Sequence, residues 1–168
     1  MTEHELIDSD TKLELDVEEF AYAGKFRVSS RKAVTRDEEE VVAALSLSPD
    51  RADENAVRVR YITVCEDRRG EGIGSALLDF AAERLSESYD HVRISVNNPY
   101  SYAAARKAGF DWTGEETGLA ELVMERPSPC EGDEYMRHVE ALCAFEERDL
   151  SDEEEKFVRR KLDEARGE

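Results

Sequence analysis

The sequence has few cysteines and few histidines, and their spacing argues against two kinds of site. The three cysteines form no CxxC pair, and an odd number gives no disulfide framework. The three histidines are equally scattered, so no zinc-binding spacing occurs. We therefore expect a reducing cytoplasm and no structural metal.

Long apolar runs are also absent. No stretch approaches the roughly 20 apolar residues that span a membrane. The first residues, "MTEHELIDSD", are acidic and polar, whereas a secretory signal needs a basic region followed by an apolar one. Hydrophobic residues still make up 40% of the 168 positions, which is enough for the core of one domain. The sequence therefore predicts a globular protein without a membrane partner.

Positive charge is scarce. Lysine and arginine number 23 against 41 acidic residues, and the net charge of −18 repels nucleic acid and anionic membranes. Residues 1–55 carry a net −8, residues 56–127 a net −3 and residues 128–168 a net −7. Because only 6 of the 23 bases are lysine, a salt-adapted, halophile-like surface is favoured over a merely acidic cytosolic one. An anionic ligand fits best in the nearly neutral middle segment.

Hydrophobic periodicity predicts an α/β or α+β domain. Thr35 and Glu38 fit a capping box that would open a helix. The expected elements are strands at 12–20 and 24–30, a helix at 36–45, a strand at 56–64, a helix ending near 86, a strand at 91–96, a short helix within 98–109 and a strand at 119–126.

The last forty residues are predicted to form a helical pair after a linker at 127–134. Met136, Val139, Leu142 and Cys143 lie at helical spacing, and "SDEE" at 151–154 is a second capping box. Their narrow apolar stripe must pack on the domain or on a partner, and a homodimer is one such arrangement. The predicted domains are therefore residues 1–127, and residues 128–168 as linker and helical extension.

The stretch "CEDRRGEGIGSALLDF" places three glycines just before a helix. A dinucleotide fingerprint needs GxGxxG, and the third glycine is misplaced for it; a GxxxxGK[ST] loop needs a lysine that is missing. Glycines at alternate positions let a ligand approach backbone N–H groups, and the free donors at a helix N-terminus favour phosphate. An ordinary glycine-rich turn is the competing interpretation.

Two motifs together resemble the GNAT superfamily of N-acetyltransferases. "VCEDRRGEGIGSALLDFA" is similar to the family's [RQ]xxGx[GA] acyl-coenzyme A signature, and "ISVNNPYSYAAARKAGFDWTGE" is similar to its second motif. They span residues 56–126 in the family's order. The resemblance implies that residues 1–127 form a GNAT-like domain. Its mixed, mostly antiparallel central sheet would be flanked by helices and would bulge and splay at the cofactor site.

The resemblance also implies which residues bind acetyl-CoA, the expected co-substrate. The end of the strand at 56–64 would offer backbone groups to the pantetheine arm, and a backbone N–H near Val64 would stabilise the oxyanion. Arg106 and Lys107 would lie near the adenosine, although a solvated helix face explains each of them equally. The predicted cofactor-binding residues are Ile62, Thr63, Val64, Arg69, Gly70, Gly72, Ile73, Gly74, Ser75 and Asn98.

The proton-handling residues fit the family less well. The family's tyrosine that protonates the departing thiolate stands five residues before the Gly-Phe phenylalanine, and Ala105 occupies that position here. Tyr102 is the predicted catalytic replacement, one turn away, with packing against the sheet as the alternative. Cys65 and Glu66 are candidate bases, and a water chain to a distant carboxylate stays open.

The resemblance implies an enzyme that transfers an acetyl group from acetyl-CoA directly to a primary amine of a small molecule or peptide. An acidic lining would suit a cationic acceptor, but acid is common throughout the chain. A non-catalytic acyl-CoA-binding or sensing module is the alternative, because Ala105 replaces the family tyrosine and no base is evident.

Overall fold

A computed structural model describes residues 2–7, 12–128 and 134–167 of the chain. It divides into two compact units, Met1–Arg93 and Ile94–Glu168, and each is described by itself. Seven strands belong to one open, mostly antiparallel sheet in the order β1-β2-β3-β4-β5-β7-β6. The mixed α/β fold predicted from the sequence is confirmed.

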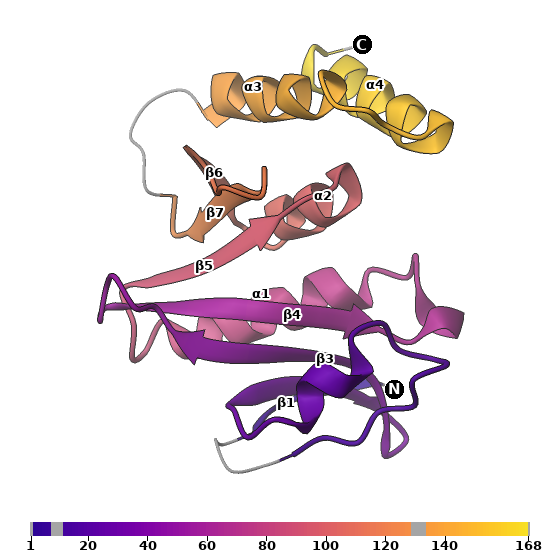
Figure 1. Cartoon of the computed structure of the whole chain (residues 1–168), viewed down its shortest axis with the longest axis vertical. Coiled ribbons are helices and arrows are strands. Elements are labelled where there is room, and N and C mark those ends of the chain that lie inside the picture. Colours follow the sequence, from indigo (N-terminus) through magenta and orange to yellow (C-terminus); the bar gives the residue numbers. More distant parts are fainter. Residues whose placement is uncertain (1, 8–11, 129–133, 168) are drawn as a thin grey trace. The chain divides into compact units, whose positions relative to one another are not determined.

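The first unit is an antiparallel meander with one long helix (Figure 1). Within it, α1 and the short helix η1 cover opposite faces of the strands (Figure 1). The strand at 56–64 and the strand at 91–96 have the predicted bounds. The elements are β1 (Thr2–Ile7), η1 (Ala23–Arg27), β2 (Lys32–Asp37), β3 (Glu40–Pro49), β4 (Ala56–Val64), η2 (Glu66–Arg68), α1 (Ile73–Leu85) and β5 (His91–Val96), which crosses into the second unit.

The helix predicted at 36–45 is wrong, because these residues belong to the β2–β3 hairpin. Glu38 and Glu39 have positive φ values of 51° and 78°, as a two-residue hairpin turn requires. Val42 to Leu47 are all buried, so both faces of β3 are covered. A strand buried on both faces has the continuous apolar run of a buried helix, and periodicity alone cannot separate the two. Thr35 does not cap a helix; its hydroxyl contacts the His4 ring Nδ1 at 2.8 Å.

The strands predicted at 12–20 and 24–30 are also wrong. The segment runs through turns into η1, and Leu13 N–H donates to Phe26 O at 2.8 Å. Leu15, Phe20 and Phe26 are buried together against Ala44 of β3. The apolar residues of this irregular segment therefore cover one face of the sheet. Alternation over a few residues does not distinguish such a segment from a strand.

The second unit begins in β5 and ends in two helices. The predicted C-terminal helical pair is confirmed, and Ser151 and Glu154 form the predicted capping box. Strand β6 is missing from the sequence prediction because Gly114 and two glutamates break its apolar pattern. Part of the predicted linker, 129–133, lies outside the described residues. The elements are α2 (Pro99–Lys107), β6 (Asp111–Glu116), β7 (Leu122–Arg126), α3 (Glu134–Glu146) and α4 (Asp152–Ala165).

Tyr102 and His138 join α2 to α3 in the core of this unit. The Tyr102 side chain is fully buried, and its hydroxyl lies 2.7 Å from His138 Nδ1. Phe145 is also fully buried, with its ring centroid 5.8 Å from that of Tyr102. No helix among the described residues is long and apolar enough to span a membrane.

The half-buried position of His138 predicts a pH effect on stability. Burial lowers its pKa from 6.5 to about 4, and the charge of Arg106 acts in the same direction. Between these two values the unfolded chain binds the proton that the folded chain excludes. Stability should therefore fall as the pH drops from 6.5 towards 4.

A matched variant isolates this effect from the other titrating groups. His138→Gln keeps a polar partner for Tyr102 but does not titrate. Thermal unfolding followed by fluorescence of Trp112, which lies in β6, should show a flatter pH dependence for the variant across this range. Parallel curves for the two proteins would contradict the assignment.

Candidate functional site

The glycine-rich stretch forms a loop between the end of β4 and the start of α1. Gly70 and Gly72 have positive φ values of 85° and 82°, a backbone conformation that side chains with a Cβ rarely adopt. Gly72 is the N-cap of α1, and its carbonyl accepts the Ala76 N–H at 3.0 Å. The N–H groups of the first turn precede that bond, so they point out of the helix end without helical acceptors.

Arg68 holds the loop in place through two carboxylates. Its guanidinium lies 2.7 Å from Asp37 at the end of β2 and 3.0 Å from Glu71 in the loop. The hydrogen bonds that Arg68 donates to Glu71 and Asp37 raise its pKa, and the bond to Asp37 lowers the pKa of that carboxyl. Arg68 is therefore engaged within the protein and does not contribute a free charge to a ligand.

Arg69 and Gly74 bring the loop against the end of β4. Arg69 is exposed, and its Nε donates to the Val64 carbonyl at 3.3 Å. A Cβ at Gly74 would lie 3.2 Å from Val64 Cγ2, which is closer than ordinary van der Waals contact. Glycine at 74 therefore lets the first turn of α1 pack directly on the strand. Ser75 and Ile73 are buried at the same helix end.

These residues fit a phosphate group. Gly70 is exposed, and a Cβ built there would meet nothing within 4 Å, so open space adjoins the loop. Backbone donors at the start of α1 and the guanidinium of Arg69 are the groups that a pyrophosphate requires. The two positive-φ glycines end directly at a helix N-terminus, a geometry that fits a phosphate-binding loop as well as a glycine-rich turn.

A bulge in β4 decides which side chains face each side of the sheet. Leu47 pairs with Val59 and Ser46 with Tyr61, so Arg60 is the extra residue. Such a bulge in this strand is what the family resemblance implies. Beyond it, Ile62 and Val64 share the face of their β3 partners Leu45 and Ala43. Tyr61 and Thr63 share the other face, with Ser46 and Ala44.

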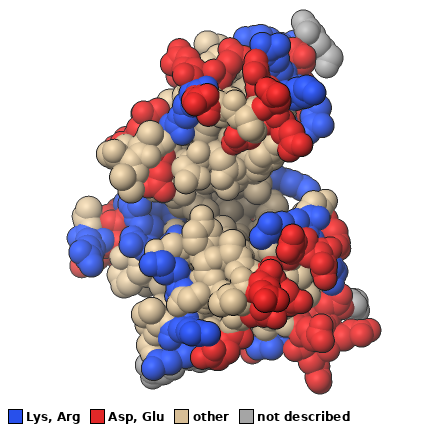
Figure 2. All heavy atoms as spheres, turned by 45° about the vertical axis from the view of Figure 1, so that its right-hand side comes forward, with Lys and Arg blue, Asp and Glu red and all other residues tan. Residues whose placement is uncertain are grey.

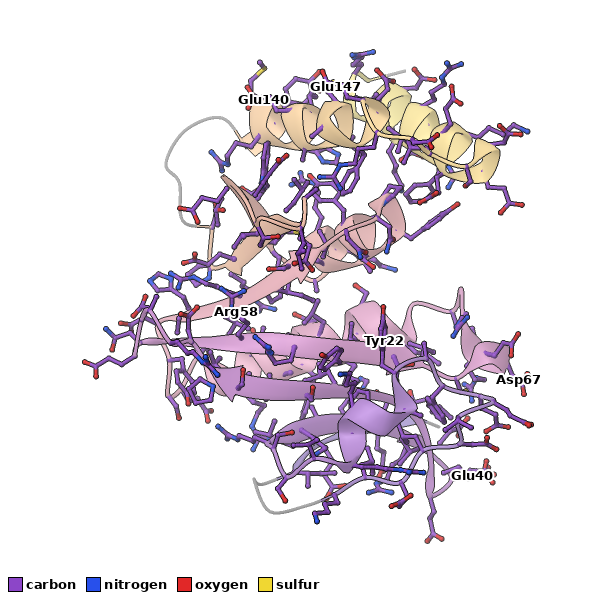
Figure 3. All side chains as sticks on the ribbon, viewed as in Figure 1. Tyr22, Glu40, Arg58, Asp67, Glu140 and Glu147 are labelled. Atoms are coloured by element: carbon purple, nitrogen blue, oxygen red, sulfur yellow. The ribbon has the colours of Figure 1, made fainter. Side chains whose placement is uncertain are left out.

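That second face carries Tyr61 and Thr63 in the last part of β4. Tyr61 packs against the Phe20–Phe26 cluster, with the exposed Tyr22 ring 5.5 Å away. Figure 3 shows Tyr22 over the later part of β4. Cys65 is half-buried against the same cluster, and Glu66 is exposed. The structure therefore leaves the predicted base among several candidates.

Asn98 and Tyr102 lie in the second unit. Asn98 is the N-cap of α2, and its side-chain oxygen accepts the Ser101 N–H at 2.9 Å. Tyr102 is enclosed with His138, and Ala105 is buried one turn further on. Arg106 lies 3.6 Å from Asp111 in an ion pair, whereas Lys107 is exposed.

The first unit thus brings together the predicted residues of β4 and the loop. One group of basic residues received no role from the sequence. Arg58 and Arg60 line a pocket of about 600 Å³ with Arg51 at the start of β4. Alternation along a strand predicts which side chains share a face. It does not predict that the bulge and the preceding loop bring these three arginines together.

Comparisons with known proteins agree with the fold. A family model described as "Acetyltransferase (GNAT) family" matches residues 3–110. The structure of a nourseothricin acetyltransferase is similar at 27% identity and a TM-score of 0.50, covering 60% of this chain and 66% of that one. A GNAT family acetyltransferase from Elizabethkingia anophelis with acetyl-CoA bound has a TM-score of 0.56 at 14% identity, covering 74% and 96%.

A search of curated sequences finds no match. The family model nevertheless spans well over half of the chain and includes β4, the glycine loop and α2. The chain therefore belongs to the GNAT acetyltransferase family.

Proposed function

We propose that this protein transfers an acetyl group from acetyl-CoA to a primary amine of a small molecule or peptide. Membership of the family supports acetyl-CoA as the co-substrate and acetyl transfer as the general reaction. The observation that carries the proposal for this chain is the loop from Arg69 to Ser75. Its two positive-φ glycines end at the start of α1, directly beside the end of β4.

In this proposal the first unit binds the co-substrate. The N–H groups at the start of α1, Arg69 and the glycine backbone hold the pyrophosphate. Residues 62–64 offer backbone groups to the pantetheine arm, and a backbone N–H near Val64 polarises the carbonyl that is attacked. Asn98 stays in the proposal through its family position. Bound acetyl-CoA supplies the activated acetyl group.

The acid that protonates the departing sulfur is the least supported part of the proposal. Tyr102 remains the candidate from the sequence, but its buried hydroxyl is held by His138. A thiolate is a fair leaving group and needs little help from an acid. Transfer to an amine therefore does not depend on Tyr102.

Substituting Tyr102 distinguishes a structural role, pairing with His138, from a catalytic role as the acid. Tyr102→Phe removes the hydroxyl that pairs with His138, so the free energy of unfolding should fall by about 1 to 3 kcal/mol. Turnover measured well below the unfolding temperature should stay within about threefold of wild type, because no proton transfer is lost. A selective loss of kcat at alkaline pH with unchanged stability would instead identify Tyr102 as the acid.

The main experiment combines binding with turnover. Calorimetry with acetyl-CoA and with CoA tests binding, and release of free thiol across a panel of primary amines tests transfer. We expect binding of acetyl-CoA and amine-dependent thiol release. Binding without release for any amine would favour the sensing module, which the replacement of the family tyrosine by Ala105 already supports. Absence of binding would overturn both.

A further inference from the structure

The pocket at the start of β4 is distinct from the glycine loop. It is formed entirely within the first unit, and residues 48–52 and β4 line it. Its volume of about 600 Å³ is in the range of small-molecule sites. Its lining residues are Ser48, Pro49, Asp50, Arg51, Ala52, Arg58 and Arg60.

The charge of this pocket is opposite to that of the chain. Three guanidinium groups and one carboxylate line it, although acidic residues outnumber basic ones by 41 to 23 overall. Figure 2 shows acidic side chains crowded at the lower right of the view and basic ones gathered at its left, the side on which β4 begins in Figure 1. A local excess of arginine in an acidic protein attracts anions to that position.

The single carboxylate in the pocket is already engaged. Asp50 is buried, and its carboxylate lies 3.1 Å from Arg93 and 3.4 Å from Arg58. Burial alone raises its pKa, but the Ala52 N–H, the hydrogen bond from Arg93 and the two arginine charges outweigh burial and lower it. Asp50 therefore stays ionised and fixes Arg58 in the pocket wall.

Arg51 and Arg60 are the groups available to a ligand. Within the described residues, 2–7, 12–128 and 134–167, neither forms an ion pair with a carboxylate. Both side chains are exposed, and both line the same pocket as Arg58. Arginine presents a planar set of donors that matches a carboxylate or phosphate, so Arg51 and Arg60 can both donate to an anion that enters the pocket.

The strand register relates this pocket to the end of β4. Arg58 pairs with Ser48, which shares a face of β3 with Ser46 and Ala44. The face that bears Tyr61 and Thr63 therefore also bears Arg58. Val64 lies four positions after Arg60, a distance of about 13 Å along an extended strand.

From this arrangement we infer that the arginine pocket of Arg51, Arg58 and Arg60 binds an anionic group of the acceptor, a carboxylate or a phosphate. The inference rests on the proposed acetyl transfer at the end of β4. An acceptor that fits carries its anion about 13 Å from the amine, the span of about four extended residues. This requirement replaces the expectation of a cationic acceptor that the overall acidity suggested.

The first test measures anion binding without acetyl-CoA. Calorimetric titration with citrate and with inorganic phosphate, at constant ionic strength, is compared for wild type, Arg51→Gln/Arg60→Gln and Arg84→Gln/Arg166→Gln. The two variants have the same net charge, and the second changes exposed arginines outside the pocket. Wild type and the control should bind at least one anion, and the pocket variant should bind it about tenfold more weakly or worse.

Each result of this test has a clear meaning. Citrate binding indicates a carboxylate ligand and phosphate binding a phosphate ligand. Equal affinities in all three proteins, or no binding by any, overturn the inference. If the pocket variant loses acetyl-CoA binding while the control keeps it, the arginines hold the co-substrate and the inference is wrong.

The second test examines the acceptor. Two tetrapeptide amides with free N-termini differ only at the fourth residue, glutamate in one and glutamine in the other. Wild type should acetylate the glutamate peptide with a kcat/KM about tenfold higher, and the pocket variant should lose this preference. Equal rates, or acetylation of neither, overturn the requirement for an anionic acceptor. The proposed acetyl transfer fails separately, when acetyl-CoA is neither bound nor consumed with any amine.

Discussion

Replacing Asp111 by asparagine is expected to lower the free energy of unfolding of the second unit by about 3 to 5 kcal/mol. The Asp111 side chain is only 4% exposed, and Arg137 lies 2.7 Å from it and Arg106 3.6 Å from it. Its carboxylate also accepts hydrogen bonds from the Ser128 hydroxyl and the Trp112 N–H. Asparagine keeps the shape but removes the negative charge that pairs with Arg137, whose side chain is 15% exposed.

The neighbouring tryptophan makes this loss measurable. Trp112 is the single tryptophan of the chain and directly follows Asp111 in β6. Urea unfolding followed by its fluorescence should show a midpoint well below that of wild type. Asp163→Asn is the matched control, because Asp163 is exposed on α4 and the charge change is identical. A difference of less than about 1 kcal/mol between the two variants, the range of a surface ion pair, would show that Asp111 is not essential to the fold.

The position of the glycine loop between a strand and a helix could be predicted from the sequence because it depends on local backbone. Strand β4, the glycine loop and α1 follow one another in the chain, so their spacing defines the geometry directly. Gly70 and Gly72 have the positive φ values that glycine permits. The bounds of β4 and β5 were predicted correctly for the same reason, since both strands alternate apolar and polar residues over most of their length.

The N-terminal part could not be predicted because tertiary contacts decide it. Residues 36–45 have an apolar pattern compatible with a helix, and only the burial of both faces of β3 makes them a strand. The bulge at Arg60 shifts the face of every later β4 side chain, and its only sign in the strand's sequence is the adjacent apolar pair Tyr61–Ile62. The arginine pocket depends on both features, and charge counts along the chain do not reveal it.

The proton-handling residues could not be predicted from the sequence for a different reason. The sequence placed Tyr102 one turn from the family's tyrosine position, but a spacing argument does not show which side chains a later helix will cover. His138 of α3 contacts the Tyr102 hydroxyl from 36 positions further along the chain. A sequence motif cannot predict contacts of this kind when the contacting residue lies beyond the end of the motif.

Gly72→Val is expected to weaken acetyl-CoA binding by about tenfold to a hundredfold. Gly72 has a φ of 82° at the N-cap of α1, and a β-branched residue in this conformation costs about 1 to 2 kcal/mol or shifts the backbone. Either response moves the N–H groups that a pyrophosphate requires. The valine side chain also places apolar atoms where the ligand must approach the backbone. Titration calorimetry with acetyl-CoA measures the loss.

Gly114→Val separates this effect from general destabilisation. Gly114 has a similar φ of 89°, and a Cβ there would meet nothing within 4 Å, so the backbone cost is comparable. It lies in β6, in the second unit and outside the glycine loop. We expect both variants to lose similar stability, with near-normal acetyl-CoA affinity for Gly114→Val alone. Equal affinity in the two variants would mean that the glycine loop is a turn that does not bind the co-substrate. Backbone strain alone would then explain any loss of affinity, because Gly114 lies outside the loop.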